Sequence, residues 1–453
     1  ILVFFKNTFI RSASMTTILE EEPFAAVVDG SSLKCVCSHC FLRAEDKPLQ
    51  RCSRCKVVSY CSTSCQKKDW IIHKDECVFL VNVSPNIPRS TARLMGRLLI
   101  MKFRGECTSV KASANGRSFD DLMHHAEEIQ SSGHHLQLFT SLVHGLQQYV
   151  DEEFMIETQE LLRYFGRMVI NSFGITGDDQ VTVGEGVYLG LSALNHSCAP
   201  DAFVRFRGRT AILRSPVADQ KFSNELTIPY TNLDTLTSDR QATLERQYFF
   251  RCNCKVCRNK ERDGYARSLQ CDTCTKGVCL VMDSTSVLTC VHCAAVLSIP
   301  VDEAFRMNQE IEWQLEKQKG DTKDVSRNLK SDVALFKKYH TVLSRFNLPL
   351  ASLAYRIVNL ALSMDRRDIA LDHAYSFHDA YERFLPRGHP LLTYSLLTAS
   401  EAASFVDPPS VQVLNLLEDA RHACLLSHGP RDPESVNIDR QISRYRTRML
   451  NAS

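Results

Sequence analysis

The sequence predicts an α+β protein in which zinc sites stabilise several small units. Three observations lead to this fold class. Most of the 19 cysteines stand in Cys-x-x-Cys pairs. A β-type pattern runs through residues 181–230, and from about residue 300 the chain is amphipathic and helical to its end. We therefore expect a β core, cysteine-rich modules beside it and a C-terminal array of helices.

The composition is that of an ordinary globular chain. Its 453 residues are too many for one compact core, so we expect about two to four domains. Hydrophobic residues make up 44% of the chain and charged residues 23%. The formal net charge of +2 excludes a global attraction to nucleic acid or to an acidic membrane. No apolar run approaches the roughly 20 residues that span a bilayer, so we expect no membrane partner.

The first residues, ILVFFKNTFIRSAS, begin with Ile1 rather than Met, so we expect that this is not a complete natural N-terminus. We interpret ILVFF as a buried β-strand, and the end of a secretory or mitochondrial presequence is the alternative. The stretch ILEEEPFAAVV, residues 18–28, is predicted as further strand material.

Helical and β patterns alternate along the rest of the chain. Residues 90–170 show helical periodicity. VTVGEGVYLG, AFVRF, TAILRS and ELTIPY predict strands, with FRGR at 206–209 as a hairpin turn. Among the C-terminal helical stretches, two end in the breakers LPRGHP and SHGPRDP. The glycines of these breakers, Gly388 and Gly429, have a spacing near that of helix-pair repeats, which predicts a small helical array.

The first cysteine module offers eight soft ligands in four pairs. Structural zinc takes four Cys or His ligands, so eight predict two ions. A segment this small buries too little apolar surface to fold alone, so the metals supply the folding energy. Cys35, in KCVCSHC, is a spare thiol or a competitor of the first ligand. The eight ligands are Cys37, Cys40, Cys52, Cys55, Cys61, Cys65, His73 and Cys77.

The second cluster, RCNCKVC, has three thiols and is one short of a structural zinc site. Its members are Cys252, Cys254 and Cys257. Cys198 stands alone in the motif NHSC, far from other cysteines in the sequence, and is the candidate for the fourth ligand. A zinc ion there would hold the cysteine segment against the NHSC loop and position that loop without performing chemistry.

The third cluster has zinc-ribbon spacing, two Cys-x-x-Cys pairs separated by fifteen residues. Its predicted ligands are Cys271, Cys274, Cys290 and Cys293. Cys279, inside the loop, is expected to be free, and Cys107 and Cys424 are expected core residues. This cysteine usage in a long chain indicates three to four structural zinc ions and a reducing compartment.

The first module resembles a MYND finger. The resemblance implies interleaved sites, with Cys37, Cys40, Cys61 and Cys65 on one zinc and Cys52, Cys55, His73 and Cys77 on the other. MYND fingers bind Pro-rich peptides, which are therefore expected partners. The module is also locally basic, which leaves open a weak nucleic-acid contact beside the solvated surface that we favour. The basic residues are Arg51, Arg54, Lys56, Lys67, Lys68 and Lys74.

NHSCAP, NELTIPY and QYFFRCNCKVC follow one another along the chain. Together with the finger and with INSFGITGDDQVTVGEGVYLGLSALNHSCAP, they resemble the SET and MYND domain protein lysine methyltransferases, the SMYD family. ERFLPRGHP and LSHGPRDPES resemble the C-terminal helices of that family. The resemblance covers the chain from about residue 18 to its end.

The resemblance implies a pseudoknotted SET-domain β-fold, split by the finger and a helical insert, with a post-SET zinc site and a TPR-like C-terminal array. The expected units are 1–33 for the N-terminal part of the SET domain, 34–80 for the finger, 81–175 for the insert, 176–250 for the SET core, 251–265 for the post-SET segment, 266–299 for a zinc-ribbon-like insertion and 300–453 for the helical domain.

The resemblance also implies methyl transfer from S-adenosylmethionine to a lysine of a histone or another protein. Such an in-line displacement needs two aligned partners, a deprotonated amine and a narrow dry channel, but no metal and no covalent nucleophile. Tyr230 matches the catalytic tyrosine near the transferring methyl. The family positions that contact the cofactor correspond to Asn195, His196, Ser192, Tyr230, Tyr248 and Phe250. The positions that line the lysine channel correspond to Asn171, Phe173, Tyr248 and Phe250. Taken singly, each of these residues would ordinarily be a packing or loop residue. Taken together, in the order found in the family, they favour the functional interpretation.

Two of the departures from the family pattern bear on function. No glycine precedes Gly30, so the Gly-Arg-Gly-like turn that would wrap the cofactor is missing, through truncation or through a degenerate cofactor site. The ribbon cluster is an insertion. The alternative hypothesis is therefore a catalytically inactive SET/MYND zinc scaffold that recruits protein partners in transcriptional regulation. A purely DNA-binding protein is disfavoured by the charge balance. We expect a monomer in the nucleus, the cytoplasm or both.

Overall fold

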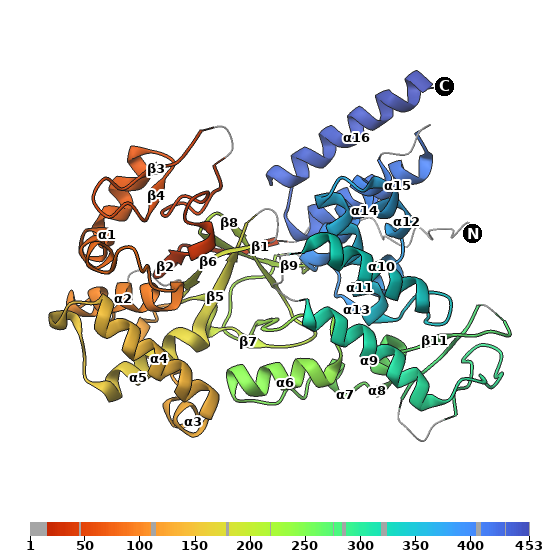
Figure 1. The fold of residues 1–453 in the computed structure, drawn as a ribbon, viewed down its shortest axis with the longest axis horizontal. Coiled ribbons are helices and arrows are strands. Elements are labelled where there is room, and N and C mark those ends of the chain that lie inside the picture. Colours follow the sequence, from red (N-terminus) through yellow and green to blue (C-terminus); the bar gives the residue numbers. More distant parts are fainter. Residues whose placement is uncertain are drawn as a thin grey trace.

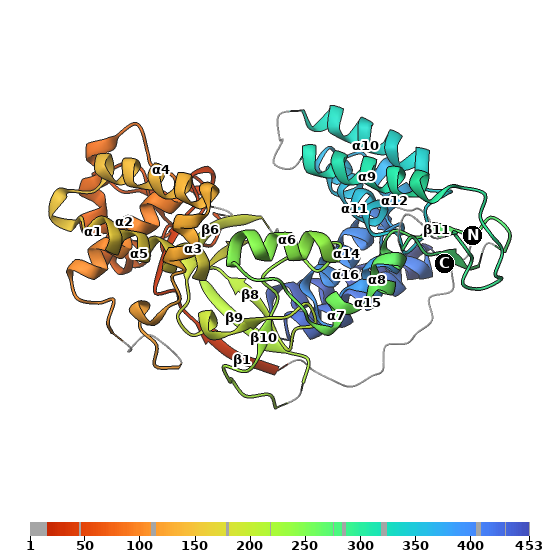
Figure 2. The ribbon, with the colours of Figure 1, turned by 90° about the horizontal axis from the view of Figure 1, so that it is seen from below.

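The structure is a computed structural model. It describes residues 16–44, 47–109, 115–177, 181–217, 219–274, 276–282, 287–318, 324–404, 409–430 and 432–452. The strand expected in ILVFF lies outside the described residues. Figures 1 and 2 show the cysteine module and the helical insert on one side, the strands in the middle and the C-terminal helices on the other. The predicted α+β class is confirmed, and no described helix is both long and apolar enough to cross a membrane.

Two three-stranded antiparallel sheets form the centre, in the orders β1-β9-β8 and β2-β6-β5. The predicted hairpin at FRGR is confirmed. Gly208, in its turn, has φ +58°, and a Cβ there would lie 2.2 Å from the carbonyl oxygen of Cys40, so the turn requires glycine. The strands are β1 (Thr16–Glu21), β2 (Ala25–Val28), β5 (Ser172–Thr176), β6 (Thr182–Val187), β8 (Phe203–Arg207) and β9 (Thr210–Ser215).

A short parallel pair joins two distant segments of the chain. β7 (Asn195–His196) pairs with β10 (Thr227–Ile228), Asn195 opposite Thr227 and His196 opposite Ile228. The strand predicted for ELTIPY is thus shorter than expected, because its two-residue partner offers only two ladder positions. The parallel pairing brings NHSC beside the residues that follow β10.

The cysteine module contains β3 (Gln50–Arg51), β4 (Ser59–Tyr60) and the long helix α1 (Thr63–Val83). The predicted helical region then contains α2 (Ser90–Phe103), α3 (Ala126–Ser131), α4 (Gly133–Tyr149) and α5 (Thr158–Asn171). Two buried arginines of α2 connect it to β2. Arg93 donates to the carbonyl oxygen of Val28 at 3.0 Å and Arg97 to that of Ala26 at 3.1 Å. The insert is therefore fixed to the edge of the second sheet.

The remaining elements lead from the sheets into the helical array. α6 (Thr237–Tyr248), α7 (Lys255–Arg258), α8 (Lys260–Ala266), β11 (Leu269–Gln270) and β12 (Val278–Cys279) come first. The array contains α9 (Val301–Lys317), α10 (Val325–Tyr339), α11 (Leu348–Ser363), α12 (Arg367–His373), α13 (His378–Phe384), α14 (Pro390–Ala403), α15 (Val411–Ser427) and α16 (Pro433–Ala452). The stretch DIALDHAYSFHDAYERFL contains α12 and α13, which are separated by a turn whose Ala374 and Phe377 are buried.

Candidate functional site

Among the described residues, four groups of cysteine and histidine side chains have the ligand atoms of each group within 4.8 Å of one another. A zinc–sulfur bond of about 2.3 Å in a tetrahedron separates two thiolates by about 3.8 Å. The sulfur–sulfur distances in these groups run from 3.5 to 3.8 Å, so the four sets fit zinc. They are Cys37, Cys40, Cys61 and Cys65; Cys52, Cys55, His73 and Cys77; Cys198, Cys252, Cys254 and Cys257; and Cys271, Cys274, Cys290 and Cys293. The structure thus brings together every predicted ligand.

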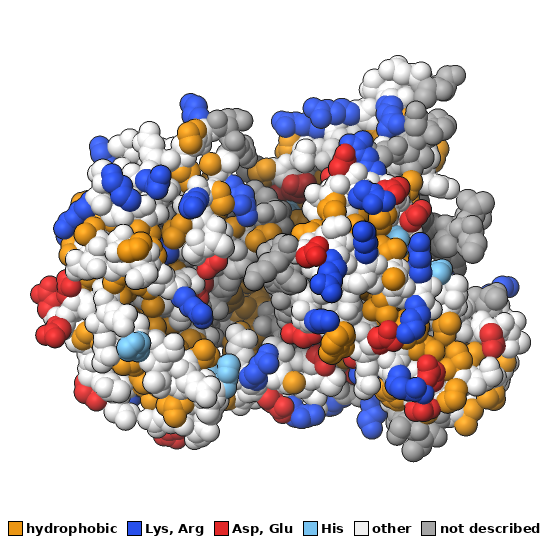
Figure 3. All heavy atoms as spheres, in the orientation of Figure 1, with side chains coloured by type: hydrophobic (Ala, Val, Ile, Leu, Met, Phe, Trp, Pro, Cys, Tyr) orange, Lys and Arg blue, Asp and Glu red, His pale blue; other side chains and the backbone are white. Residues whose placement is uncertain are grey.

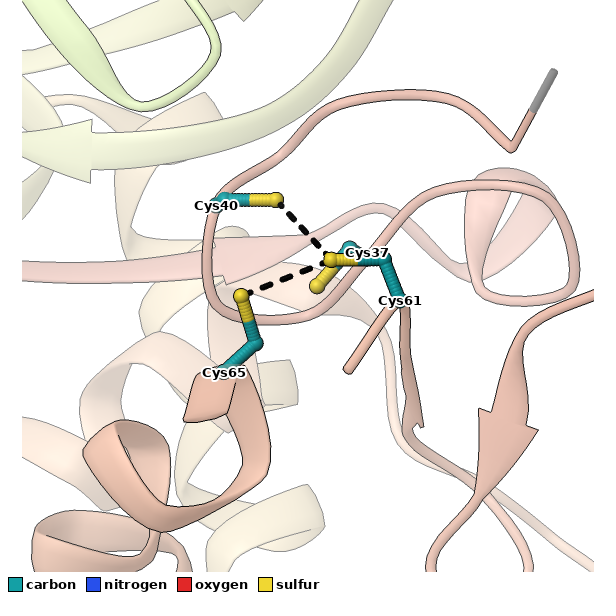
Figure 4. Close-up of side chains that lie close together, drawn as sticks. All are labelled: Cys37, Cys40, Cys61 and Cys65. Atoms are coloured by element: carbon teal, nitrogen blue, oxygen red, sulfur yellow. Dashed lines mark hydrogen bonds between the residues drawn. The ribbon is translucent and has the colours of Figure 1, made fainter. Parts of the chain in front are cut away.

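The first site of the cysteine module is half exposed (Figure 4). The sulfur of Cys61 lies 3.7 Å from that of Cys40 and 3.5 Å from that of Cys65. Ser62 caps α1 and accepts the backbone N–H of Cys65 at 3.2 Å, which holds this ligand at the helix start. A hydrogen bond from Cys40 lowers the pKa of Cys37 to about 4. Cys35 lies outside the group and accepts from Arg43 at 3.4 Å.

The second site of the module is buried in all four ligands. Nε2 of His73 lies 3.7 Å from the sulfur of Cys55, and its Nδ1 lies 3.0 Å from Oε2 of Glu76. A metal on Nε2 leaves the proton on Nδ1, which then donates to this carboxylate and orients the ring. Glu76 also pairs with Arg97 at 2.7 Å. Since Arg97 contacts β2, Glu76 links the metal site to the second sheet.

The third site answers why Cys198 stands alone in the sequence. Its sulfur lies 3.5 Å from that of Cys257. Arg240 of α6, fully buried, donates from Nε to Cys198 at 3.3 Å and from Nη2 to Cys257 at 3.9 Å. A zinc ion with four thiolates carries a net charge of −2, so this buried guanidinium compensates part of it.

The fourth site is held by two turns that present backbone N–H groups to sulfur. Cys271 and Cys293 lie 3.7 Å apart, as do Cys274 and Cys290. Cys271 accepts the N–H of Cys274, and Cys274 accepts that of Gly277, each at 3.4 Å. Such donors stabilise thiolates. Cys279 is buried on β12 outside the ligand group, and Cys107 and Cys424 are buried as expected.

The six basic residues of the cysteine module are all exposed. They are Arg51, Arg54, Lys56, Lys67, Lys68 and Lys74. Figure 3 shows Lys and Arg side chains spread over this lobe, at the upper left, rather than gathered in one stripe. This distribution fits the solvated surface favoured from the sequence.

The parallel strand pair creates a chain of contacts from the third metal site to Tyr230. The backbone N–H of Tyr230 donates to Nδ1 of His196 at 3.0 Å. Nδ1 is therefore unprotonated, and the neutral ring carries its proton on Nε2, which lies 3.3 Å from the sulfur of Cys198. Burial and the nearby Arg240 lower the pKa of His196 to about 4, so the ring stays neutral near pH 7.

Aromatic rings lie next to the ring of Tyr230. The rings of Tyr230 and Tyr248 are 4.8 Å apart, and those of His196 and Phe250 are 6.0 Å apart. Phe249, with φ +61°, ends α6. The Tyr230 hydroxyl donates to the carbonyl oxygen of Leu194. Burial raises the pKa of Tyr230 to about 12, so its hydroxyl is neutral near pH 7.

The other expected site residues hold the backbone around this centre. The amide of Asn171 donates to the carbonyl oxygens of Met123 at 3.0 Å and Arg167 at 2.8 Å. The hydroxyl of Ser192 donates to the backbone carbonyl oxygen of Tyr188 at 2.5 Å. Phe173 packs edge-on against Tyr188. Asn195 is exposed. The side chains of Asn171 and Ser192 thus fix local structure, whereas Phe173 and Tyr230 face a cavity.

This cavity has a volume of about 420 Å³ and lies between the strands and the C-terminal helices. Its walls come from β5, β8, the segment after β10, and α14. Among the lining residues are Phe173, Arg205, Tyr230, Asn232, His389 and Tyr394. The Tyr230 centre is therefore reached through a space wide enough for peptide side chains.

Several residues around the site are absent from the sequence-based expectation. Glu21 is buried and accepts the backbone N–H groups of Gly190 at 2.7 Å and Leu191 at 3.0 Å, just before NHSC. The ring of His125, a residue with φ +47°, lies 5.4 Å from that of Phe249. Arg240 is a third such residue. No motif or spacing marks them, because their partners are far away in the sequence.

Comparisons with known proteins identify the cysteine module and the relatives of the chain. Residues 37–77 match the family model of the MYND finger. The chain is 33% identical over 251 residues to the human histone-lysine N-methyltransferase SMYD3, covering 54% of the chain and 57% of that protein. It is 31% identical over 231 residues to the mouse N-lysine methyltransferase SMYD2, covering 50% of the chain and 51% of that protein. The Arabidopsis thaliana histone-lysine N-methyltransferase ASHR1 is 25% identical over 451 residues, covering 95% of the chain and 90% of that protein.

The chain thus spans about half the length of the mammalian relatives it matches. The resemblance predicted from the sequence is confirmed by the finger and by these three methyltransferases.

Proposed function

We propose that this chain, which is similar to SET and MYND domain lysine methyltransferases, is itself a protein-lysine N-methyltransferase that uses S-adenosylmethionine and modifies histone or other protein lysines. The observation that carries the proposal is the β7–β10 pair, which brings Asn195 and His196 beside the segment that leads to Tyr230. The backbone N–H of Tyr230 donates to His196, and Tyr230 itself lines the 420 Å³ cavity. The pseudoknotted SET fold, the TPR-like character of the helical array and the domain boundaries given above belong to the same proposal.

The residues fit the cofactor. The adenine ring of S-adenosylmethionine needs an apolar surface to lie against and a hydrogen-bonding partner at its edge. The half-buried rings of Tyr248 and Phe250 offer the apolar surface, and the exposed amide of Asn195 offers the hydrogen-bonding partner. When bound, S-adenosylmethionine supplies an electrophilic methyl group. His196 would hold the NHSC loop in place through its contact with Cys198. Ser192 would hold the segment before this loop through its hydrogen bond to the carbonyl oxygen of Tyr188.

The chain's own groups would prepare the lysine. Burial among Phe173, Tyr248 and Phe250 disfavours an ammonium, lowers the lysine pKa and favours loss of its proton to solvent. The Tyr230 hydroxyl gives its hydrogen to Leu194, so its oxygen lone pairs can accept an amine N–H. This contact would aim the nitrogen lone pair along the channel, the alignment that an in-line displacement requires.

The test combines cofactor titration by calorimetry with a radiolabel methylation screen on zinc-replete protein. We expect Tyr230→Phe to keep its zinc and its fold but to lose turnover by about a hundredfold or more, since one oriented dipole is removed. Tyr188→Phe is the matched control, because its hydroxyl donates to the carbonyl oxygen of Arg209 away from the cavity. Normal turnover in Tyr230→Phe would refute the catalytic assignment.

The second candidate function is a catalytically inactive zinc scaffold that recruits protein partners in transcriptional regulation. It rests on the finger itself, whose residues 37–77 match the MYND family model. It predicts that the finger binds Pro-rich peptides while no S-adenosylmethionine binds. Titration of the cofactor separates the two functions directly, and a nucleic-acid titration tests the weaker contact of the basic finger.

We also propose that the protein acts as a monomer in the nucleus, the cytoplasm or both. Four cysteine-rich sites keep their thiolates available for zinc in reducing compartments. Light scattering of the zinc-loaded chain and imaging of a tagged chain test these two statements.

A further inference from the structure

A hollow between the cysteine module and the helical insert gathers positive charge. It has a volume of about 850 Å³ and is separate from the proposed methyl transfer, since Tyr230 lines a different cavity. Its walls come from the segment after β2, from the β3–β4 hairpin and from the connection between α1 and α2. The basic residues that line it are Lys34, Arg51, Lys56 and Arg89, and all four are exposed.

These four cations have no partner among the described residues. No ion pair or side-chain hydrogen bond joins any of them to another described residue, whereas exposed cations elsewhere do pair with carboxylates, as Arg306 does with Glu303. Asp29 is the one carboxylate among the described residues that line the hollow, and it accepts the hydroxyl hydrogen of Ser31 at 2.8 Å. The described lining therefore carries four positive charges and one negative charge.

One further carboxylate lies near the hollow without lining it. Glu185 of β6 interacts with Ser90 and Thr91, which do line the hollow, and with the buried Arg93. Burial raises the pKa of Glu185, so its negative charge is disfavoured there. Even with Glu185 included, four cations face two carboxylates, and the potential in the hollow is positive.

The hollow also offers apolar surface but no aromatic ring. Leu33 is buried, and Val57, Ile87 and Pro88 are half-buried around it. No Phe, Tyr, Trp or His is among its described lining residues. Bases of single-stranded nucleic acid stack on aromatic rings, and Pro-rich peptides lie in aromatic-lined grooves, so both of these ligands fit the hollow poorly. An aliphatic side chain would gain free energy by leaving water here.

We propose that this hollow binds an acidic peptide of a partner protein, in which Asp or Glu residues stand on either side of an aliphatic side chain. The carboxylates would pair with the four cations, and the aliphatic side chain would cover the apolar residues. An exposed ion pair contributes little by itself, but four cations around one hollow act on the same ligand. The hollow would recruit this partner whether or not the chain transfers methyl groups.

The first test measures peptide binding by fluorescence anisotropy. It uses the zinc-replete full chain, because the zinc ligand Cys55 also lines the hollow. The probes are fluorescein-labelled peptides of equal length with a central Leu, flanked either by Glu or by Gln residues. We expect the Glu peptide to bind about tenfold more tightly than the Gln peptide at low salt, and the difference to shrink as added salt screens the ion pairs. Equal binding of the two peptides at low salt would overturn the inference.

A third peptide tests the apolar surface. It keeps the Glu residues and carries Ser in place of the central Leu. It should bind about tenfold more weakly than the Leu peptide, since no aliphatic side chain is then buried. Unchanged binding would contradict the proposed role of the aliphatic side chain.

The second test assigns the binding to the hollow. Lys34→Gln/Arg89→Gln removes two of its cations, and neither residue has a described partner whose loss would disturb the fold. We expect the preference for Glu over Gln to fall by about threefold or more, with zinc content and circular dichroism unchanged. Arg51→Gln, from a different wall of the hollow, should lower the preference as well. The matched control is Lys67→Gln/Lys68→Gln, which removes two exposed cations of α1 that do not line the hollow. An equal fall in both double variants would mean that the peptide follows the overall charge of the finger, and the inference would be wrong.

A single-stranded oligonucleotide with the same net charge as the Glu peptide separates a peptide site from a nucleic-acid site. We expect the oligonucleotide to bind more weakly than the Glu peptide, because the described lining offers no ring on which bases could stack. If it binds more tightly and Lys34→Gln/Arg89→Gln weakens its binding, the four cations belong to a nucleic-acid surface and the proposal of an acidic peptide is wrong.

Discussion

Nε2 of His196 lies 3.3 Å from the sulfur of Cys198, so the residue proposed to hold the cofactor is in contact with a zinc ligand two positions later. The same ring accepts the backbone N–H of Tyr230 at 3.0 Å. A structural zinc site and the proposed catalytic tyrosine are therefore connected through one neutral imidazole. Removal of the metal would release both ends of this contact chain.

The first prediction concerns Cys198→Ser. A hydroxyl is a poor substitute for a thiolate on zinc, so the metal content should fall from about four ions per chain to about three. Affinity for S-adenosylmethionine should fall with it, because the NHSC loop loses its connection to the RCNCKVC segment. Metal analysis and calorimetry measure the two effects. Cys35→Ser, a thiol outside the ligand groups, is the control and should retain all its zinc.

The second prediction concerns Arg240→Met. This fully buried guanidinium donates to Cys198 and Cys257. Methionine retains much of the apolar volume but leaves the thiolates without that charge. We expect the zinc affinity of this site to fall by about 10- to 100-fold, the range seen when partners of metal ligands are removed. Competition with a chelator measures it, and the exposed Arg258→Met should behave as wild type. Unchanged zinc release would show that backbone donors suffice.

The third prediction concerns Glu76→Gln. Glu76 is buried with Arg93 and Arg97, and it also accepts from His73. Loss of its charge leaves buried cations with less compensation, which costs about 3–5 kcal/mol for pairs of this kind. We expect faster hydrogen exchange in α2 and β2 of the full chain, because the two arginines also hold β2. Glu127→Gln, on an exposed face of α3, should leave the exchange unchanged. If the faster hydrogen exchange were confined to the cysteine module, the prediction that Glu76 stabilises the contact between α2 and β2 would be wrong.

The fourth prediction concerns pH and His428. Its pKa is lowered to about 3 in the folded protein by burial and by Arg205 and Arg214, against about 6.5 in an unfolded chain. Below pH 6.5 the unfolded chain therefore binds a proton that the folded one does not. The contribution of His428 to stability is complete above pH 6.5 and is lost by about 1.4 kcal/mol per pH unit as the pH falls towards 3.

This pH effect is measured by urea unfolding at pH 7 and pH 5.5, with His428→Gln as the comparison. Both proteins lose zinc affinity in acid, so the difference between them isolates the histidine. The wild type should lose about 1 kcal/mol more than the variant over this interval. Equal losses would mean that His428 is protonated in the folded state.

The sequence by itself determined the metal sites. The two cysteines of a Cys-x-x-Cys pair are only three positions apart, so a single tight turn can present both to one metal ion, whatever the rest of the fold. Even the solitary Cys198 was found by counting, because the cluster of three lacked a fourth ligand. Hydrophobic periodicity likewise predicted the insert helices and the β8–β9 hairpin, since both depend on neighbours a few residues away.

Only the tertiary structure decided what surrounds these groups. Arg240 lies 42 positions from Cys198, Glu21 lies 169 positions from Gly190, and Arg205 meets Asp432 across more than two hundred residues. It also decided that the amide of Asn171 holds backbone carbonyls and that β10 is only two residues long. Such contacts leave no period or motif in the sequence, because a buried charge is stabilised by whichever partner the fold brings to it.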